Sequence, residues 1–194
     1  MSSREGRAIM LDEVIQTMTK QAVEEVEKRN PKLASSKKLA IAKKIAISAL
    51  KYAVLKIEPQ DSIIFDWNRM LSFDGNTGPY LLYAHTRCSS ILKKAKRFKT
   101  EYFSKMSPPE KHLIKILMNY ENTLVEVAKH YRPNMLCNYI YSLATAFSNF
   151  YQNCPVLKAD TPQQKNFRLT LTNATKIVLE DALKLLGIKT PELM

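Results

Sequence analysis

The stretch FDGNTGPYLLYAHTR, residues 73–87, places a tight turn directly before a helix. Gly75 and Gly78 are two of only four glycines in 194 residues. Asn76 is a typical turn residue, and Pro79 suits the first position of a new helix, where its missing N–H is no loss. A chain so poor in glycine therefore concentrates its turn residues at this one point.

Two aromatic side chains and one basic side chain follow the turn at helical spacing. Tyr80, Tyr83 and Arg87 stand at i, i+3 and i+7, so the sequence predicts that they share one side of the new helix. Two interpretations stay open from this pattern alone. The rings are either core side chains with satisfied hydroxyls, or part of a surface that binds a ligand.

Almost every segment on either side of this stretch repeats apolar residues at intervals of three or four, the period of a buried helix face. Helices are predicted at about 10–26, 39–53, 79–95, 113–128, 135–147 and 169–186. Residues 62–67, SIIFDW, are predicted to be extended or irregular. There is no alternation of strand and helix patterns and no internal repeat, so the predicted fold class is all-α, a helical bundle.

The charge of the chain favours a polyanionic partner. Thirty Lys and Arg face eighteen Asp and Glu, a formal net charge of +12. Six basic residues and no acid lie between Arg87 and Lys99, among them Lys93 and Lys94. The alternative is a lysine-rich, solvated surface without a specific partner.

Several classes of function lack their motifs here. There is no phosphate-binding glycine loop, no H-E-x-x-H and no G-x-S-x-G. Three histidines are too scattered for a metal cluster, and three cysteines without a C-x-x-C pair are expected to be reduced, half-buried thiols. No secretory signal or membrane-spanning segment is evident. Aromatic and arginine side chains beside lysines instead favour a module that binds single-stranded RNA, by stacking on bases and pairing with phosphates.

Six segments resemble arginyl-tRNA synthetases. Residues 73–95, FDGNTGPYLLYAHTRCSSILKKA, resemble the segment that joins their catalytic and anticodon-binding domains, with Leu82 where the family usually has glutamine. Residues 1–15 are similar to the family's KMSKS loop without its leading lysine, and residues 46–55 resemble a further segment of the family. Residues 139–157, 167–171 and 185–194 match the family's terminal helical domain. The Asp-Ala-Leu-Arg tag of the terminal domain is replaced by Lys-Asn-Phe-Arg at 165–168, so only Arg168 agrees.

This resemblance implies a bundle of the class I anticodon-binding type, in residues 73–194, preceded by a KMSKS-loop remnant and connecting helices in residues 1–72. It implies tRNA as the partner, specifically arginine isoacceptors, with no DNA and no membrane, and a cytoplasmic location. The residues it implies for tRNA contact are Gly75, Asn76, Gly78, Tyr80, Tyr83, Arg87, Tyr151 and Met194. The basic run after Arg87 adds Lys93 and Lys94 to the predicted tRNA-binding residues. Residues matching the ATP loop are Met1, Ser2, Ser3 and Arg4.

The family's nucleotide-binding catalytic domain has no counterpart in this sequence. We therefore expect no catalytic residue, no metal site and no cofactor bound by this chain alone, with ATP and Mg required only in a complete enzyme. Whether the chain is a fragment or the product of its own gene stays open. The alternative function is a stand-alone RNA-binding or protein-interaction module that docks to a separate catalytic subunit or self-associates through its N-terminal helices.

Overall fold

The computed structural model describes residues 10–63 and 65–191. Every regular element in these residues is a helix, which confirms the predicted all-α class. The helices are α1 (Leu11–Arg29), α2 (Ser35–Leu55), α3 (Trp67–Leu71), α4 (Gly78–Ala95), α5 (Pro108–Met118), α6 (Tyr120–His130), α7 (Pro133–Asn153) and α8 (Pro162–Leu185). None of them is both long and apolar enough to cross a membrane.

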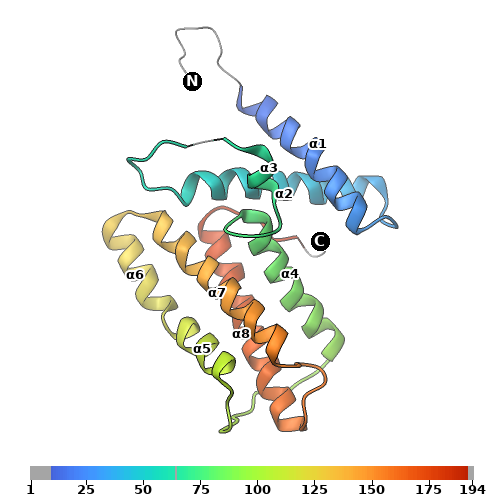
Figure 1. Cartoon of the computed structure of the whole chain (residues 1–194), viewed down its shortest axis with the longest axis vertical. Helices are drawn as coiled ribbons and strands as arrows, with labels where there is room; N and C mark the ends of the chain where they lie inside the picture. The colour runs from blue at the N-terminus through green and yellow to red at the C-terminus, as the bar shows by residue number, and fades with distance from the viewer. Residues whose placement is uncertain (1–9, 64, 192–194) are drawn as a thin grey trace.

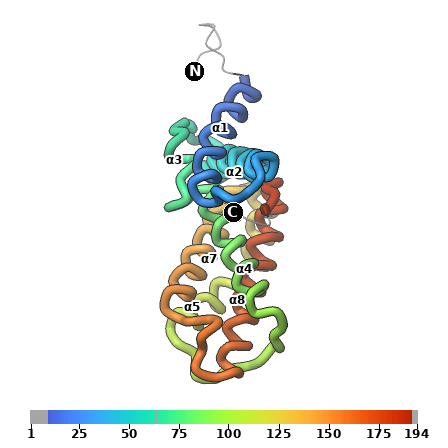
Figure 2. Tube along the Cα trace, turned by 90° about the vertical axis from the view of Figure 1, so that its right-hand side faces the viewer, coloured from blue at the N-terminus to red at the C-terminus, as the bar shows by residue number. Residues whose placement is uncertain are grey.

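Helices α4 to α8 run roughly along the long axis of the molecule, and α1 to α3 lie at one end of them, where α2 crosses that end (Figure 1). The same arrangement is visible from the side in Figure 2. Helix α2 packs against α1 and also against α4 and α7. It therefore contacts elements on both sides of the expected division between residues 72 and 73, and that division stays a prediction.

Helix α7 forms the centre of the bundle because apolar side chains recur along it at helical intervals. Ile140, Leu143, Phe147 and Phe150 are each at most 1% exposed. Helices α4, α5, α6 and α8 all contact α7. Helix α7 also carries Tyr151, one of the predicted RNA-contacting residues, next to the buried Phe150.

Three details differ from the sequence-based expectations. The helix predicted over 113–128 is two helices, α5 and α6, which meet at Asn119. Leu39 is exposed, because the neighbouring Lys38 lies in the interface and its ammonium donates to Glu27 at 3.0 Å. The three cysteine thiols are fully buried rather than half-buried, and burial raises the pKa of Cys137 to about 12.

A buried ion pair joins α5 to α8. Arg168 Nε donates to Glu110 Oε1 at 2.7 Å, and Glu110 is 0% exposed. The other carboxylate oxygen accepts from the backbone N–H and the hydroxyl of Ser107, at 2.6 and 2.8 Å. Arg168 Nη1 also donates to the carbonyl of Pro155 at 3.0 Å. Both charges are thus paired and hydrogen-bonded, which is the condition for keeping them buried.

The Glu110 pair predicts a loss of stability in acid. Burial by itself would raise the pKa of Glu110, but hydrogen bonds from Arg168 and Ser107 outweigh it and lower the pKa. A carboxyl whose pKa is lower in the folded state contributes stability above its unfolded pKa, about 4.3, and loses it as the pH falls through the folded value. We expect the difference in unfolding free energy between the parent and Glu110→Gln to shrink below about pH 4. Urea denaturation from pH 7 to pH 3 measures it, and a constant difference would contradict the assignment.

Candidate nucleic-acid interface

The turn before α4 is fixed by its backbone conformation and by a helix cap. Gly75 has a φ of +78°, the left-handed region in which a side chain is disfavoured. The Thr77 hydroxyl donates to the Ser72 carbonyl at 2.6 Å and accepts from the Tyr80 N–H at 3.2 Å, as an N-cap does. Gly78 is the first helical residue, so Pro79 occupies the second position rather than the predicted first.

Asn76 ties the turn to helix α2. Its Oδ1 accepts from the Tyr52 hydroxyl at 2.5 Å, and its backbone carbonyl accepts from Lys56 Nζ at 2.8 Å. The Tyr52 hydroxyl also lies 3.0 Å from the carbonyl of Cys137 in α7. Burial raises the pKa of Tyr52 and lowers that of Lys56. The position of the turn is therefore set by α2, a dependence that the sequence reasoning missed.

Gly78 is buried against α2. A Cβ atom built at Gly78 would lie 2.6 Å from the Ser48 carbonyl oxygen and 2.7 Å from its hydroxyl. Real Cβ atoms essentially never approach another heavy atom this closely, so the small residue is required by helix packing. Gly75 has nothing within 4 Å of such a Cβ and lies exposed, where a ligand can approach its backbone.

The predicted side of α4 carries a cluster of stacked side chains. The guanidinium carbon of Arg87 lies 4.5 Å from the centre of the Tyr83 ring and 4.9 Å from that of Tyr151 in α7. Arg87 also donates a hydrogen bond from Nη2 to the Tyr83 hydroxyl. Tyr80 packs edge-on against Tyr141, with ring centres 5.9 Å apart.

These rings satisfy both interpretations that the sequence left open. Tyr80 and Tyr83 are half-buried and pack against the core, and Tyr151 is 40% exposed. Each ring thus has a packed part and a part in contact with solvent. Contacts with Tyr83 and Tyr151 hold the Arg87 guanidinium in place, so it loses little freedom on binding a ligand.

A surface hollow of about 280 Å³ lies beside this cluster. Tyr80, Tyr83 and Arg87 line it from α4, and Phe147, Ser148 and Gln152 line it from α7. The turn side contributes Phe73 and Asp74, and α1 contributes Arg29, whose guanidinium carbon lies 4.0 Å from the centre of the Phe73 ring. Two guanidinium groups and several rings therefore surround one opening.

Sequence reasoning missed Arg29, Phe73 and Gln152. Phe73 and Asp74 belong to the quoted stretch, so they could have been predicted from it. Arg29 is 44 residues away from Phe73, and no sequence pattern around it indicated a binding residue. Its position results from the packing of α1 against α2 and α3.

The remaining predicted residues lie apart from the hollow or outside the described residues. Lys93 and Lys94 are exposed in the last turn of α4 and do not line it. Met1 to Arg4 and Met194 lie outside the described residues. The described residues contain no group of three or more His, Cys, Asp or Glu side chains that could hold a metal ion.

Comparisons with known proteins agree with this geometry. Residues 81–194 match the model of the DALR anticodon binding domain. The chain belongs to this family of helical anticodon-binding domains.

Relatives and solved structures similar to this chain include arginine–tRNA ligases. The chain is 39% identical over 188 residues to arginine–tRNA ligase of Methanosphaerula palustris and 41% identical over 194 residues to that of Shewanella denitrificans, covering 97% and 99% of this chain. Arginyl-tRNA synthetase of Thermus thermophilus matches all of the chain with a TM-score of 0.91 and 35% identity. The chain corresponds to the C-terminal, anticodon-binding part of arginyl-tRNA synthetases, and it spans about a third of the length of these relatives: 34%, 33% and 33%.

Proposed function

We propose that this chain binds the anticodon stem-loop of arginine tRNA and that unpaired bases of the loop enter the hollow beside Arg87. The observation that carries the proposal is the contact of the Arg87 guanidinium with the rings of Tyr83 and Tyr151, because Arg87 and Tyr83 line that hollow. Unpaired bases stack on aromatic rings and guanidinium planes, and splayed loops are the usual targets of sequence-specific RNA binding. The second guanidinium, Arg29, adds positive charge where the loop's phosphates approach.

In this proposal the chain supplies recognition, and a complete enzyme supplies the ligation of arginine to tRNA. ATP with Mg would act in the catalytic part that the relatives contain. The residues matching the ATP loop lie outside the described ones, so we assign this chain no step in ATP chemistry. A role in translation implies a cytoplasmic location.

Removing the rings or the guanidinium should weaken RNA binding. Base stacking contributes about 1–3 kcal/mol per base, so we expect Tyr151→Ala and Arg87→Ala each to lower affinity for an arginine anticodon stem-loop roughly 5- to 150-fold. Tyr131→Ala is the matched control, because Tyr131 is 88% exposed at the end of α6, outside the hollow. Fluorescence anisotropy at one fixed salt concentration measures the dissociation constants.

Two outcomes would overturn this proposal. The first is equal binding of the parent chain to arginine stem-loops and to stem-loops with unrelated anticodons. The second is an effect of Tyr131→Ala as large as that of Tyr151→Ala.

A second candidate function rests on a different observation. Met10, Leu11, Leu39 and Val54 expose apolar side chains on and just before helices α1 and α2, from 41% to 64% of each residue. Exposed apolar side chains gathered at one end favour docking to a separate catalytic subunit or self-association. Light scattering with and without tRNA distinguishes this function. A particle mass above that of a single chain in the absence of RNA supports self-association, and an increase on adding a catalytic subunit without RNA supports docking.

A further inference from the structure

The loop between α4 and α5, residues 96–107, crosses the end of the bundle that lies opposite α1 to α3 (Figure 1). We call it the far-end loop. Helix α8 holds its backbone in place: Gln163 Nε2 donates to the Tyr102 carbonyl at 3.0 Å, and Asn166 Nδ2 donates to the Glu101 carboxylate at 3.1 Å. The Phe103 ring packs against Phe167, with centres 5.9 Å apart. The loop is therefore an anchored segment.

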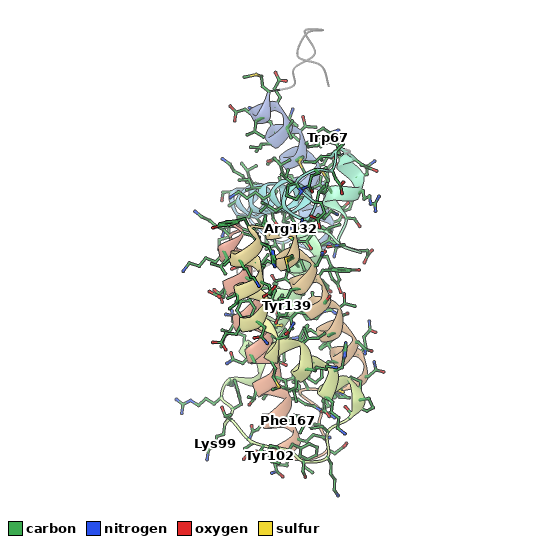
Figure 3. All side chains as sticks on the ribbon, turned by 90° about the vertical axis from the view of Figure 1, so that its left-hand side faces the viewer. Trp67, Lys99, Tyr102, Arg132, Tyr139 and Phe167 are labelled. Carbon is green, nitrogen blue, oxygen red and sulfur yellow. The ribbon has the colours of Figure 1, made fainter. Side chains whose placement is uncertain are left out.

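Tyr102 directs its ring away from this anchored backbone. The residue is 72% exposed, although Phe103 next to it packs inward. Figure 3 shows Tyr102 and Lys99 together at this end of the molecule, with Phe167 lying nearer the bundle. A large ring fixed at its backbone and open to solvent is a ready surface for stacking, because little freedom remains to be lost on binding.

Four cations accompany the ring. Lys96, Arg97, Lys99 and Lys105 are exposed on the far-end loop, and none of them takes part in an ion pair within residues 10–63 and 65–191. The single acid of the loop, Glu101, already accepts a hydrogen bond from Asn166. A polyanion bound at this loop would relieve the repulsion among these like charges.

Helix α4 connects the far-end loop to the hollow. Lys94 follows Arg87 by seven residues, so both lie on the same side of the helix, about 10 Å apart along its axis. Lys96 and Arg97 continue from there into the loop. A basic path thus leads from the stacked Arg87 to the exposed Tyr102.

We propose that the far-end loop is a second RNA-binding surface, in which Tyr102 stacks on an unpaired base and the neighbouring cations contact the phosphates that flank it. Its occupant is a single-stranded segment of the same RNA loop that occupies the hollow, so this inference rests on the proposed function. An acidic protein surface would pair with the lysines but offers no base to stack on the Tyr102 ring.

The test measures the affinity of the full chain for an arginine anticodon stem-loop over a series of salt concentrations. Tyr102→Ala is expected to weaken binding roughly 5- to 150-fold. The triple variant Lys96→Gln, Arg97→Gln, Lys99→Gln is expected to have a shallower slope of log affinity against log salt concentration. The slope should fall by about 0.7 for each phosphate that is no longer neutralised, up to about 2 in total. The control triple, Lys115→Gln, Lys129→Gln, Lys184→Gln, removes the same charge from exposed positions on α5, α6 and α8, and Tyr131→Ala is the control for Tyr102.

The outcomes separate this inference from the proposed function. If the parent chain does not prefer arginine stem-loops, the proposed function fails. If it does, and both far-end variants bind like their controls, only the second surface is overturned. A loss in the triple variant with Tyr102→Ala unchanged would overturn the stacking role of the ring.

Discussion

Replacing Arg168 by methionine is expected to cost about 3–5 kcal/mol of unfolding free energy. Methionine fills a similar volume but leaves the Glu110 carboxylate, which is 0% exposed, without its cationic partner. The two hydrogen bonds from Ser107 remain, yet they do not neutralise the charge. Urea denaturation at pH 7 measures the change.

The double variant Glu110→Gln, Arg168→Met tests the cause of this loss. Removing one partner of a buried pair leaves an uncompensated charge, whereas removing both does not. The double variant should therefore be more stable than Arg168→Met alone. A loss below about 1 kcal/mol for Arg168→Met, the range of exposed ion pairs, would contradict the buried role of the pair.

Gly78→Ala is expected to cost about 1–3 kcal/mol of stability and to weaken RNA binding as well. The new methyl group would meet the backbone carbonyl of Ser48 at 2.6 Å, so α4 must shift away from α2. That shift would move the turn and the side chains that α4 contributes to the hollow, Tyr80, Tyr83 and Arg87. Thermal unfolding and stem-loop affinity together measure the two effects.

Ser48→Ala in the same background identifies the obstructing atom. It removes the Ser48 hydroxyl, 2.7 Å from the added Cβ, but leaves the carbonyl in place. We therefore expect no recovery in Gly78→Ala, Ser48→Ala. Full recovery would show that the flexible hydroxyl, and not the backbone, requires a glycine at position 78.

Much of this site could be predicted because it is encoded locally. Tyr80, Tyr83 and Arg87 are separated by three and four residues on one helix, so their shared side follows from helical geometry alone. Turn residues likewise identified the start of α4 to within one position. The role of Gly78 was less accessible, because a glycine required by packing against α2 looks the same in a sequence as one required by an approaching ligand.

The errors arose where the spacing of apolar residues does not report a break in the backbone or the burial of a polar side chain. At Asn119 the backbone leaves helical geometry although apolar residues continue on both sides, so the pattern suggested one helix. On α8, Ile177 is exposed although it belongs to the apolar pattern of the helix predicted over 169–186, whereas Thr172 and Thr175 are buried. The threonine hydroxyls donate to the carbonyls of Arg168 and Leu171 in their own helix. Such threonines need no outside partner, and a count of apolar residues overlooks them.

The altered tag at 165–168 shows that agreement with a family sequence can have a structural cause. The one residue that agrees with the family's tag, Arg168, is the one whose side chain pairs with buried Glu110 and bonds to the Pro155 carbonyl. Phe167 packs under the far-end loop, and Lys165 and Asn166 are half-buried. The retained arginine thus has a structural reason that is independent of RNA.

The hydrogen bonds of Asn76 with Tyr52 and Lys56 determine how far the protein can be shortened. A piece trimmed to residues 81–194 would lack the turn, the Thr77 cap and the helix that holds both. It would keep the Tyr83 and Tyr151 rings but lose Phe73 and Tyr80, which line the hollow. The smallest piece that retains the turn and the whole of α2, which holds it, therefore begins no later than Ser35. A piece that also retains the Arg29 guanidinium beside the hollow must begin within α1.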